Sequence, residues 1–527
     1  MTTYFKGGRC DWERRRHFLQ KFGALTAAAT TGAWADPPEH EPAPVPNSFT
    51  RMFPRLPAFA EARPQVIAAL TDMGRPGGIM DANDPLMSGP TLLITDLTLS
   101  ANNPNAAMPN GAAGTTFLGQ FVDHDMTFDA SSRLGVAISP RQITNSRLPA
   151  LDLDSVYGGG PAADPLLYSK SDRAKLKVES GGAFEDLPRL PDGSALIADP
   201  RNDEHMIIAG LHAAFLLFHN RMVDRVRDSV RDSGETDAGD GGNAFQRARQ
   251  LTTWHYQWIV LHEMLPSFIG LAMVDDILRR GRRFYRPGDD DAAAMPVEFQ
   301  GAAYRFGHSM VRPSYRANLK GDRGGPFFGF IFDPRAEGQA DPEDMRGGAR
   351  SPRRFIGWQT FFDFGDDQVK PRKIIDTRLS TPLFRLPLAA IPAGTAPISL
   401  PQRNLLRQLT WQLPSGQRIA QAMGVPALRA GEFSELAGYR VGLEHSTPLS
   451  YYVLKEAFIA NGGQTLGPMG GRIVGEVIIG LMQTDRNSWM NAQPNWRPTL
   501  PSRFGAGEFR MVDFLTLAGV DPISRGQ

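Results

Sequence analysis

The chain has 527 residues, of which 41% are apolar, and its formal net charge is +1. This length allows a large buried core, in one large domain or in several smaller ones. A net charge so close to zero creates no field that attracts nucleic acid or an anionic membrane, which disfavours both as partners. The only cysteine is Cys10, which excludes an internal disulfide, an iron–sulfur cluster and a Cys-ligated zinc. Redox chemistry would therefore rest on His, carboxylate or Tyr side chains.

The first 35 residues have the parts of an export signal. Arg15 and Arg16 precede a weakly apolar run over residues 22–32, and Ala33-Trp34-Ala35 follows. A basic segment, a short apolar segment and an A-x-A sequence form a cleavable signal, and the paired arginines resemble the twin-arginine type. A retained basic amphipathic helix is the alternative. We expect residues 1–35 to be removed on export to the periplasm or the extracellular space, and we identify no transmembrane anchor.

The rest of the sequence predicts one large, mainly α-helical domain with little β-structure. Residues 36–89 begin Pro-rich and are expected to form an N-terminal arm. No linker divides residues 90–527, which we expect to form a single domain. Apolar residues recur at helical spacing over 205–230, 245–265, 449–460 and 470–482, although the β-branched residues of the last segment are also compatible with a strand. Residues 232–243 and 321–354 are expected to be irregular.

The first segment with candidate catalytic residues is residues 118–125. On a helix, Gln120 and His124 are four residues apart and share a face. Asp123 and Asp125 point about 100° to either side of His124. The alternative is an exposed polar turn, but the flanking residues are apolar. We therefore expect these polar side chains to contact different buried neighbours.

Two further segments carry a cation and a histidine. Arg201 and Glu204 are three residues apart at the start of a long apolar helix and face the same way, although helix-start electrostatics alone would also favour such residues. His308 lies among apolar and small residues, where a core histidine with satisfied hydrogen bonds is the common alternative to a ligand. Gly307 beside it leaves room for a bulky group to approach closely.

A fourth segment, residues 148–158, offers oxygen ligands. Asp152 and Asp154 place carboxylates at alternate positions, as a Ca²⁺ loop requires, although such loops are also common on surfaces. His205, His212 and His219 recur every seven residues, which is too far apart along a helix for one ion. They are interpreted as packing or capping residues.

In this order, the four segments resemble the animal-type haem peroxidases (the peroxidase–cyclooxygenase superfamily), in particular their bacterial branch. GQFVDHDMTF is similar to the distal motif, DPRNDE to the distal arginine segment, YRFGHSM to the proximal histidine segment and RLPALDLDSVYG to the calcium loop. LPQRNLLRQLTWQLPSGQ, TPLSYYVLKEA and GPMGGRIVGEVIIGL resemble further blocks, and the likeness spans roughly residues 90–527.

The resemblance implies a haem b cofactor and assigns roles around it. His124 would be the distal acid/base, with Gln120 beside it, and Arg201 the distal cation. Asp123 and Glu204 match the two carboxylates that can form ester bonds to the haem.

On the other side, His308 would be the proximal iron ligand and Arg305 the partner of a haem propionate. Gln417 takes the place of the amide that holds the proximal histidine. Calcium would be bound by Asp125, Asp152, Asp154 and the backbone of Leu148 and Ala150.

Three positions depart from the family. Leu148 stands where the family often has Thr, which removes a side-chain calcium ligand. The family's Arg-Gly-Arg-Asp-His stretch is replaced by Arg407-Gln408-Leu409-Thr410-Trp411, which puts details of the proximal side in doubt. His205 replaces the Met that one branch bonds to haem, so that link is not expected.

The implied activity is reduction of H2O2 with oxidation of a small donor, such as a halide, a pseudohalide or a phenol. A distal imidazole can move the peroxide protons, and a fixed guanidinium stabilises the leaving hydroxide. One alternative is a fatty-acid dioxygenase of the same superfamily, in which a Tyr precedes the proximal His by three residues. Here that position is Arg305, and Tyr304 is turned about 100° away on a helix. The other alternative is an exported haem- or calcium-binding adhesion module without catalysis.

Overall fold

The computed structural model describes residues 47–527 apart from residues 97, 100–110, 130–131, 133, 135–136, 234–240, 287–292 and 392–393. The predicted signal and the beginning of the predicted arm lie outside these residues. The helices of the first half are α2 (Pro64–Met73), α3 (Gly89–Thr95), α4 (Ala113–Met126), α5 (Asp154–Tyr157), α6 (Met206–Ser233), α7 (Gly241–Ile259), α8 (Leu265–Ile269) and α9 (Leu271–Arg280). Those of the second half are α10 (Val297–Gly301), α11 (Gly307–Met310), α12 (Leu400–Thr410), α13 (Gly416–Ala422), α14 (Leu449–Asn461), α15 (Pro468–Thr484), α16 (Trp489–Ala492) and α17 (Met511–Ala518).

Short turns and strands complete the fold. The 3₁₀ turns η5 (Pro200–Asp203) and η8 (Ala303–Phe306) and the π-helical turn η6 (Val260–Met264) adjoin the main helices. The described strands form two antiparallel pairs, β1 (Glu179–Ser180) with β2 (Glu185–Asp186) and β3 (Ser314–Asp322) with β4 (Gly325–Phe330). The predicted mainly α-helical fold is thus confirmed.

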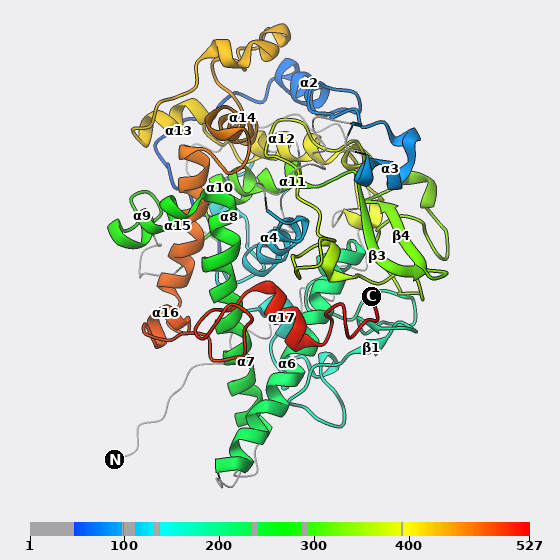
Figure 1. Cartoon of the computed structure of the whole chain (residues 1–527). Coiled ribbons are helices and arrows are strands. Elements are labelled where there is room, and N and C mark those ends of the chain that lie inside the picture. The colour runs from blue at the N-terminus through cyan, green and yellow to red at the C-terminus, as the bar shows by residue number, and fades with distance from the viewer. Residues whose placement is uncertain are drawn as a thin grey trace, which may run out of the picture.

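Helix α4 lies in the middle of the molecule and packs against α6 and α11 (Figure 1). Twelve of its fourteen residues are buried, as expected for a helix that is apolar on most sides. Gly114 and Gly119 allow close approach, because a Cβ there would come within 2.5 Å of Phe362 and within 2.9 Å of Phe268 on α8, respectively.

Helix α6 begins later than the sequence predicted. Asp199 accepts a hydrogen bond from the backbone N–H of Arg201, and Pro200–Asp203 form the separate turn η5 before α6 starts at Met206. Residues Met206–Asp232 are long and apolar enough to cross a membrane, but 83% of their most apolar window is buried inside the protein. We therefore describe α6 as a core helix.

Residues 470–482 form part of a helix, α15, and not a strand. Its glycines let neighbouring helices approach closely. A Cβ on Gly475 would come within 2.6 Å of Ile269 on α8 and Ile277 on α9. Close packing on all sides thus outweighs the strand propensity of its β-branched residues.

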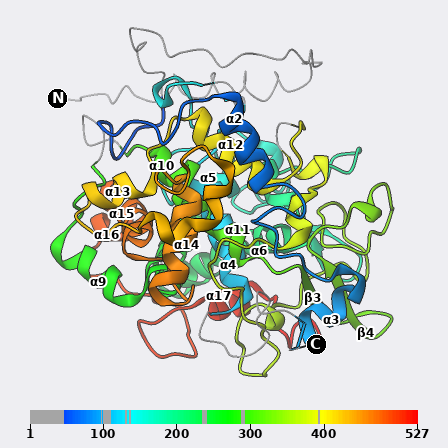
Figure 2. The ribbon, with the colours of Figure 1, turned by 90° about the horizontal axis from the view of Figure 1, so that it is seen from above.

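Two other segments are more ordered than the sequence indicated. The stretch 321–354 was expected to be irregular, but it begins inside the β3–β4 hairpin, whose register places Asp322 opposite Gly325. Within the predicted arm, helix α2 packs against α12 (Figures 1 and 2). Their contact includes a hydrogen bond from Gln402 Nε2 to the carbonyl of Thr71.

Candidate active site

A cavity of about 230 Å³ lies between α4 and η5 on one side and η8, α11 and α12 on the other. We call the first side the distal wall and the second the proximal wall. Polar residues from these distant parts of the chain meet around it: Gln120, Asp123, His124, Arg201, Glu204, Arg305, His308, Asn404 and Arg407.

On the distal wall, His124 is buried and its ring is held in one tautomer. Its Nδ1 lies 2.8 Å from Oδ1 of Asn202. Because an oxygen can only accept, Nδ1 carries the proton and Nε2 keeps its lone pair. Nδ2 of Asn202 in turn lies 3.0 Å from Nδ1 of His212. Burial and the nearby Arg201 cation lower the pKa of His124 to about 3, so the ring is neutral at physiological pH.

Arg201 is fixed by several acceptors. Its guanidinium donates to both carboxylate oxygens of Asp199, at 3.0 and 2.8 Å, and to the carbonyls of His124 and Thr127, at 3.1 and 2.7 Å. Asp199 also pairs with Arg147 at 2.7 Å. Burial alone would raise the pKa of Asp199, but the two arginines outweigh burial and lower it. The charge of Arg201 is therefore held rigidly next to His124.

The two distal carboxylates have different neighbours: Glu204 contacts a neutral amide, and Asp123 lies near the Arg201 cation. Gln120 Nε2 donates to Glu204 at 3.2 Å, and Oε1 of the same amide lies 2.9 Å from Nε2 of His205. Burial raises the pKa of Glu204 to about 8. Burial also raises the pKa of Asp123, whose carboxylate lies 3.9 Å from Nη1 of Arg201. His205, expected to pack or cap, thus also orients Gln120.

On the proximal wall, Nδ1 of His308 lies 2.8 Å from Nδ2 of Asn404 on α12. Half a turn of the amide exchanges its nitrogen and oxygen without moving other atoms. In that orientation the oxygen would accept from Nδ1–H, and the lone pair of Nε2 would be free to bind a metal. Burial lowers the pKa of His308 to about 3, so its ring is also neutral.

The prediction that Gln417 holds His308 is wrong. Both ends of the Gln417 amide bind Thr447, through its Oγ1 at 2.7 Å and its backbone N–H at 3.0 Å. The residue that contacts His308 is Asn404, which lies 96 positions away in sequence. Asn404 lies on α12 and His308 on α11, so only the tertiary fold brings this pair together, and the sequence interpretation missed it.

Arginines gather at the end of the cavity near α12. Arg305, Arg403 and Arg407 line it. Nε of Arg305 donates to the carbonyl of Gln300 at 2.8 Å, and Arg407 pairs with Asp129. Burial lowers the pKa of Arg407, and the nearby Arg305 and Arg403 add to this effect while Asp129 opposes it. Such a cluster suits an anionic group.

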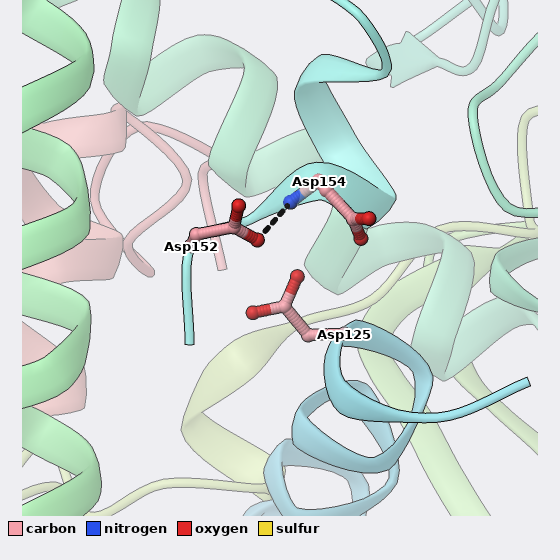
Figure 3. Close-up of side chains that lie close together, drawn as sticks. All are labelled: Asp125, Asp152 and Asp154. Carbon is pink, nitrogen blue, oxygen red and sulfur yellow. Dashed lines mark hydrogen bonds between the residues drawn. The ribbon is translucent and has the colours of Figure 1, made fainter. Parts of the chain in front are cut away.

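Next to the distal wall, Asp125, Asp152 and Asp154 form a carboxylate cluster (Figure 3). One oxygen of each lies within 4.8 Å of the others. Burial and the two neighbouring carboxylates raise the pKa of Asp125 well above its usual range. Arg147 pairs with Asp154 at 3.3 Å and with Asp199. Arg147 therefore links this cluster to the residue that anchors Arg201.

The remaining predicted calcium residues lie in the loop that carries the cluster. The carbonyl of Leu148 accepts a hydrogen bond from Ala150 N–H at 2.8 Å. The side chain of Leu148 is 41% exposed. Three carboxylates at this spacing suit a hard divalent cation.

The cavity residues fit a haem. A Cβ on Gly307, beside His308, would meet no atom within 4 Å, so a planar group can pass next to the histidine. A neutral imidazole is the form that binds iron, and the arginines near α12 match the negative charge of propionates. The carboxylates of Asp123 and Glu204 lie on the opposite wall.

Comparisons with known proteins agree with this geometry. Residues 126–325 match the family model for animal haem peroxidase. The chain is 24% identical over 449 residues to thyroid peroxidase of Sus scrofa, covering 75% of this chain and 45% of that protein. It is 26% identical over 230 residues to a probable oxidoreductase, PXDNL, of Homo sapiens, covering 39% and 15% respectively.

These matches span less than half the length of each relative. Among solved structures, peroxidase A of Dictyostelium discoideum is similar with a TM-score of 0.55 and 15% identity, over 89% of this chain and 93% of that one. This likeness supports the fold. The family resemblance predicted from the sequence is thus confirmed over residues 126–325, which match the animal haem peroxidase model.

Proposed function

We propose that this protein is a haem peroxidase that reduces H2O2 and oxidises a small donor, such as a halide, a pseudohalide or a phenol. The observation that carries the proposal is the placement of His124 and Arg201 across one cavity from His308. Haem bound here would supply the redox centre. His308 would hold its iron, and Arg305 would bind a propionate.

The distal residues then move protons and stabilise charge. Nε2 of His124, which has a free lone pair, takes the proton from one peroxide oxygen and returns it to the other as the O–O bond breaks. The guanidinium of Arg201 stabilises the negative charge that develops on the leaving hydroxide. Asn202 keeps the proton of His124 on Nδ1, which leaves Nε2 free for this cycle.

The function is tested with the haem-loaded protein and a donor panel of iodide, bromide, thiocyanate and guaiacol. We expect H2O2-dependent oxidation of at least one donor and no oxygen uptake with a polyunsaturated fatty acid. Tyr304 does not favour the dioxygenase alternative, because its hydroxyl donates to the carbonyl of Gly119 at 3.1 Å. Oxygen uptake that depends on Tyr304, without donor oxidation, would replace the proposal by this alternative.

We further propose that Asp123 and Glu204 form ester bonds to the haem during turnover. Their place on the distal wall of the cavity supports this. After peroxide treatment, acidified solvent should extract haem from the Asp123→Ala, Glu204→Ala double variant but not from the wild type. Full release from the treated wild type would contradict the ester bonds.

The cluster of Asp125, Asp152 and Asp154 is proposed to bind Ca²⁺, with the backbone carbonyls of Leu148 and Ala150. The bound ion would neutralise buried carboxylates and stabilise the link from Arg147 to Asp199. Chelation should lower the melting temperature and the peroxidase rate, and Ca²⁺ should restore both. A calcium-free protein that is indifferent to chelator would exclude the site.

We also propose export through the twin-arginine route, based on residues 1–35. N-terminal sequencing of the exported protein should begin at Asp36. A protein that stays in the cytoplasm with residues 1–35 attached would contradict export.

A further inference from the structure

Four of the eight tryptophans of the chain meet on one side of the molecule. Trp254 and Trp258 lie on α7, Trp489 lies on α16, and Trp496 lies in the segment after α16. Trp496 contacts the other three, with ring centroids 5.4, 6.0 and 6.2 Å away. We call these four residues the tryptophan cluster.

The cluster reaches the surface at Trp496. The other three tryptophans are 4–6% exposed, whereas Trp496 is partly exposed and residues 491–495 and Arg497 around it are exposed. In Figure 1, α16 and the segment that follows it run along the outer side of the molecule beside α7. A large molecule can therefore touch Trp496 without entering the cavity.

Hydrogen bonding explains only one of the three buried tryptophans of this cluster: Nε1 of Trp254 donates to the carbonyl of Asn487 at 2.9 Å. Within the described part of the chain, the buried Nε1 groups of Trp258 and Trp489 have no hydrogen-bond partner. A buried N–H without a partner destabilises the folded state, and a phenylalanine would fill much of the same space without this cost. What an indole adds is that it can be oxidised by one electron. An indole without a nearby acceptor also keeps its proton when oxidised, so the radical cation readily takes an electron back.

Packed aromatic rings connect the cluster with the distal wall. Phe121, one turn before His124 on α4, stacks on Phe215 at 4.4 Å. The contacts continue to Phe514 at 4.5 Å, to Phe218 at 4.1 Å and to His255 at 6.5 Å. His255 lies 5.1 Å from Trp496. Electron tunnelling decays less steeply through packed atoms than across gaps, so this path favours coupling between the cluster and α4, whose His124 lines the cavity.

We propose that Trp496 is a surface oxidation site at which the peroxidase oxidises bulky phenols, an inference that rests on the proposed haem peroxidase function. With haem bound and oxidised by peroxide, the Trp496 indole would give up one electron to it and become a radical cation. A phenol at the surface returns one electron and releases its proton to water, which gives a phenoxyl radical. Two such events, with the two protons, convert one H2O2 to two waters.

The size of the cavity explains why such a site would be useful. Its volume is about 230 Å³, and a bound haem would occupy much of it. We expect a small phenol such as guaiacol to reach the remaining space and a large aromatic donor to be excluded from it. Bulky phenols are therefore the substrate class that requires Trp496.

The test compares the haem-loaded wild type, Trp496→Phe and the matched control Trp358→Phe, which alters a tryptophan outside the cluster. The donors are guaiacol and a large sulfonated phenolic azo dye. Trp496→Phe should oxidise the dye at least about tenfold more slowly and guaiacol within about twofold of the wild type. The control should leave both rates close to those of the wild type. Equal dye rates in the two variants, or equal loss on both donors in Trp496→Phe, would overturn the proposal.

A second readout does not depend on donor turnover or on the folding of the variant. The wild type is treated with H2O2 without donor, frozen for electron paramagnetic resonance and digested for peptide mass spectrometry. We expect a tryptophan radical signal and oxygen addition at Trp496. An unmodified Trp496 without radical signal would overturn the surface site. If the wild type fails to oxidise even guaiacol, the peroxidase function fails instead, which separates the two outcomes.

Discussion

The two walls of the cavity hold their histidines alike but in different electrostatic surroundings. His124 and His308 each have Nδ1 2.8 Å from an asparagine amide. Behind His124, buried ion pairs run from Arg201 through Asp199 to Arg147. His308 instead depends on the neutral amide of Asn404. The distal wall is thus built for acid–base chemistry next to a fixed cation, and the proximal wall for holding a neutral ligand.

The largest expected effect comes from breaking the distal ion pairs. Asp199→Asn leaves two buried guanidinium groups without their shared carboxylate, so the protein should lose about 3–5 kcal/mol of unfolding free energy. Urea unfolding measures this loss, with the exposed Asp192→Asn as control. A loss no larger than that of the control would show that the distal charges do not depend on Asp199.

The two asparagines allow the two walls to be tested separately, because replacing each one should change the behaviour of the histidine on its own wall only. Asn202→Ala frees the tautomer of His124 and should slow the reaction with peroxide, while the ferric haem spectrum stays unchanged. Asn404→Ala should lower haem affinity by about 10- to 100-fold, as for other residues that orient a metal ligand. Haem titration and stopped-flow spectroscopy separate the two. Exchanged effects would mean that the walls are assigned the wrong way round.

The smallest effect concerns the pH dependence of stability. Burial raises the pKa of Glu204 to about 8, whereas an unfolded Glu has a pKa of about 4.3. Between these values the folded state binds more protons, so this residue makes stability fall as pH rises from about 4.3 to 8. Glu204→Gln should lack this contribution. Urea unfolding is measured at pH 5 and pH 8.5 before any peroxide exposure. The unfolding free energy should decrease less between these pH values in the variant than in the wild type. An equal decrease in both proteins would contradict the raised pKa of Glu204.

Local patterns in the sequence were enough to predict α4 and the placement of Gln120, Asp123 and His124 on it. Asn202 was missed although it is next to Arg201, because the segment was interpreted as the start of the long helix. The separate turn η5 instead turns Asn202 toward His124.

Asn404 illustrates what local spacing cannot supply. Its contact with His308 spans 96 positions and exists only because the fold brings α12 and α11 together in the proximal wall. The β3–β4 hairpin was missed for a different reason: the glycines within residues 321–329 marked the segment as irregular, although Phe327, Phe328 and Phe330 favour a strand and cross-strand pairing orders it.

The most direct test of the peroxidase account is the bimolecular rate of the haem-loaded protein with H2O2, measured by stopped-flow spectroscopy for the wild type and His124→Ala. The account predicts that the variant keeps its ferric spectrum, because His308 is untouched, but reacts about 10²- to 10⁴-fold more slowly, the usual contribution of a general acid–base group. A His124→Ala variant that reacts with peroxide as fast as the wild type would contradict the account.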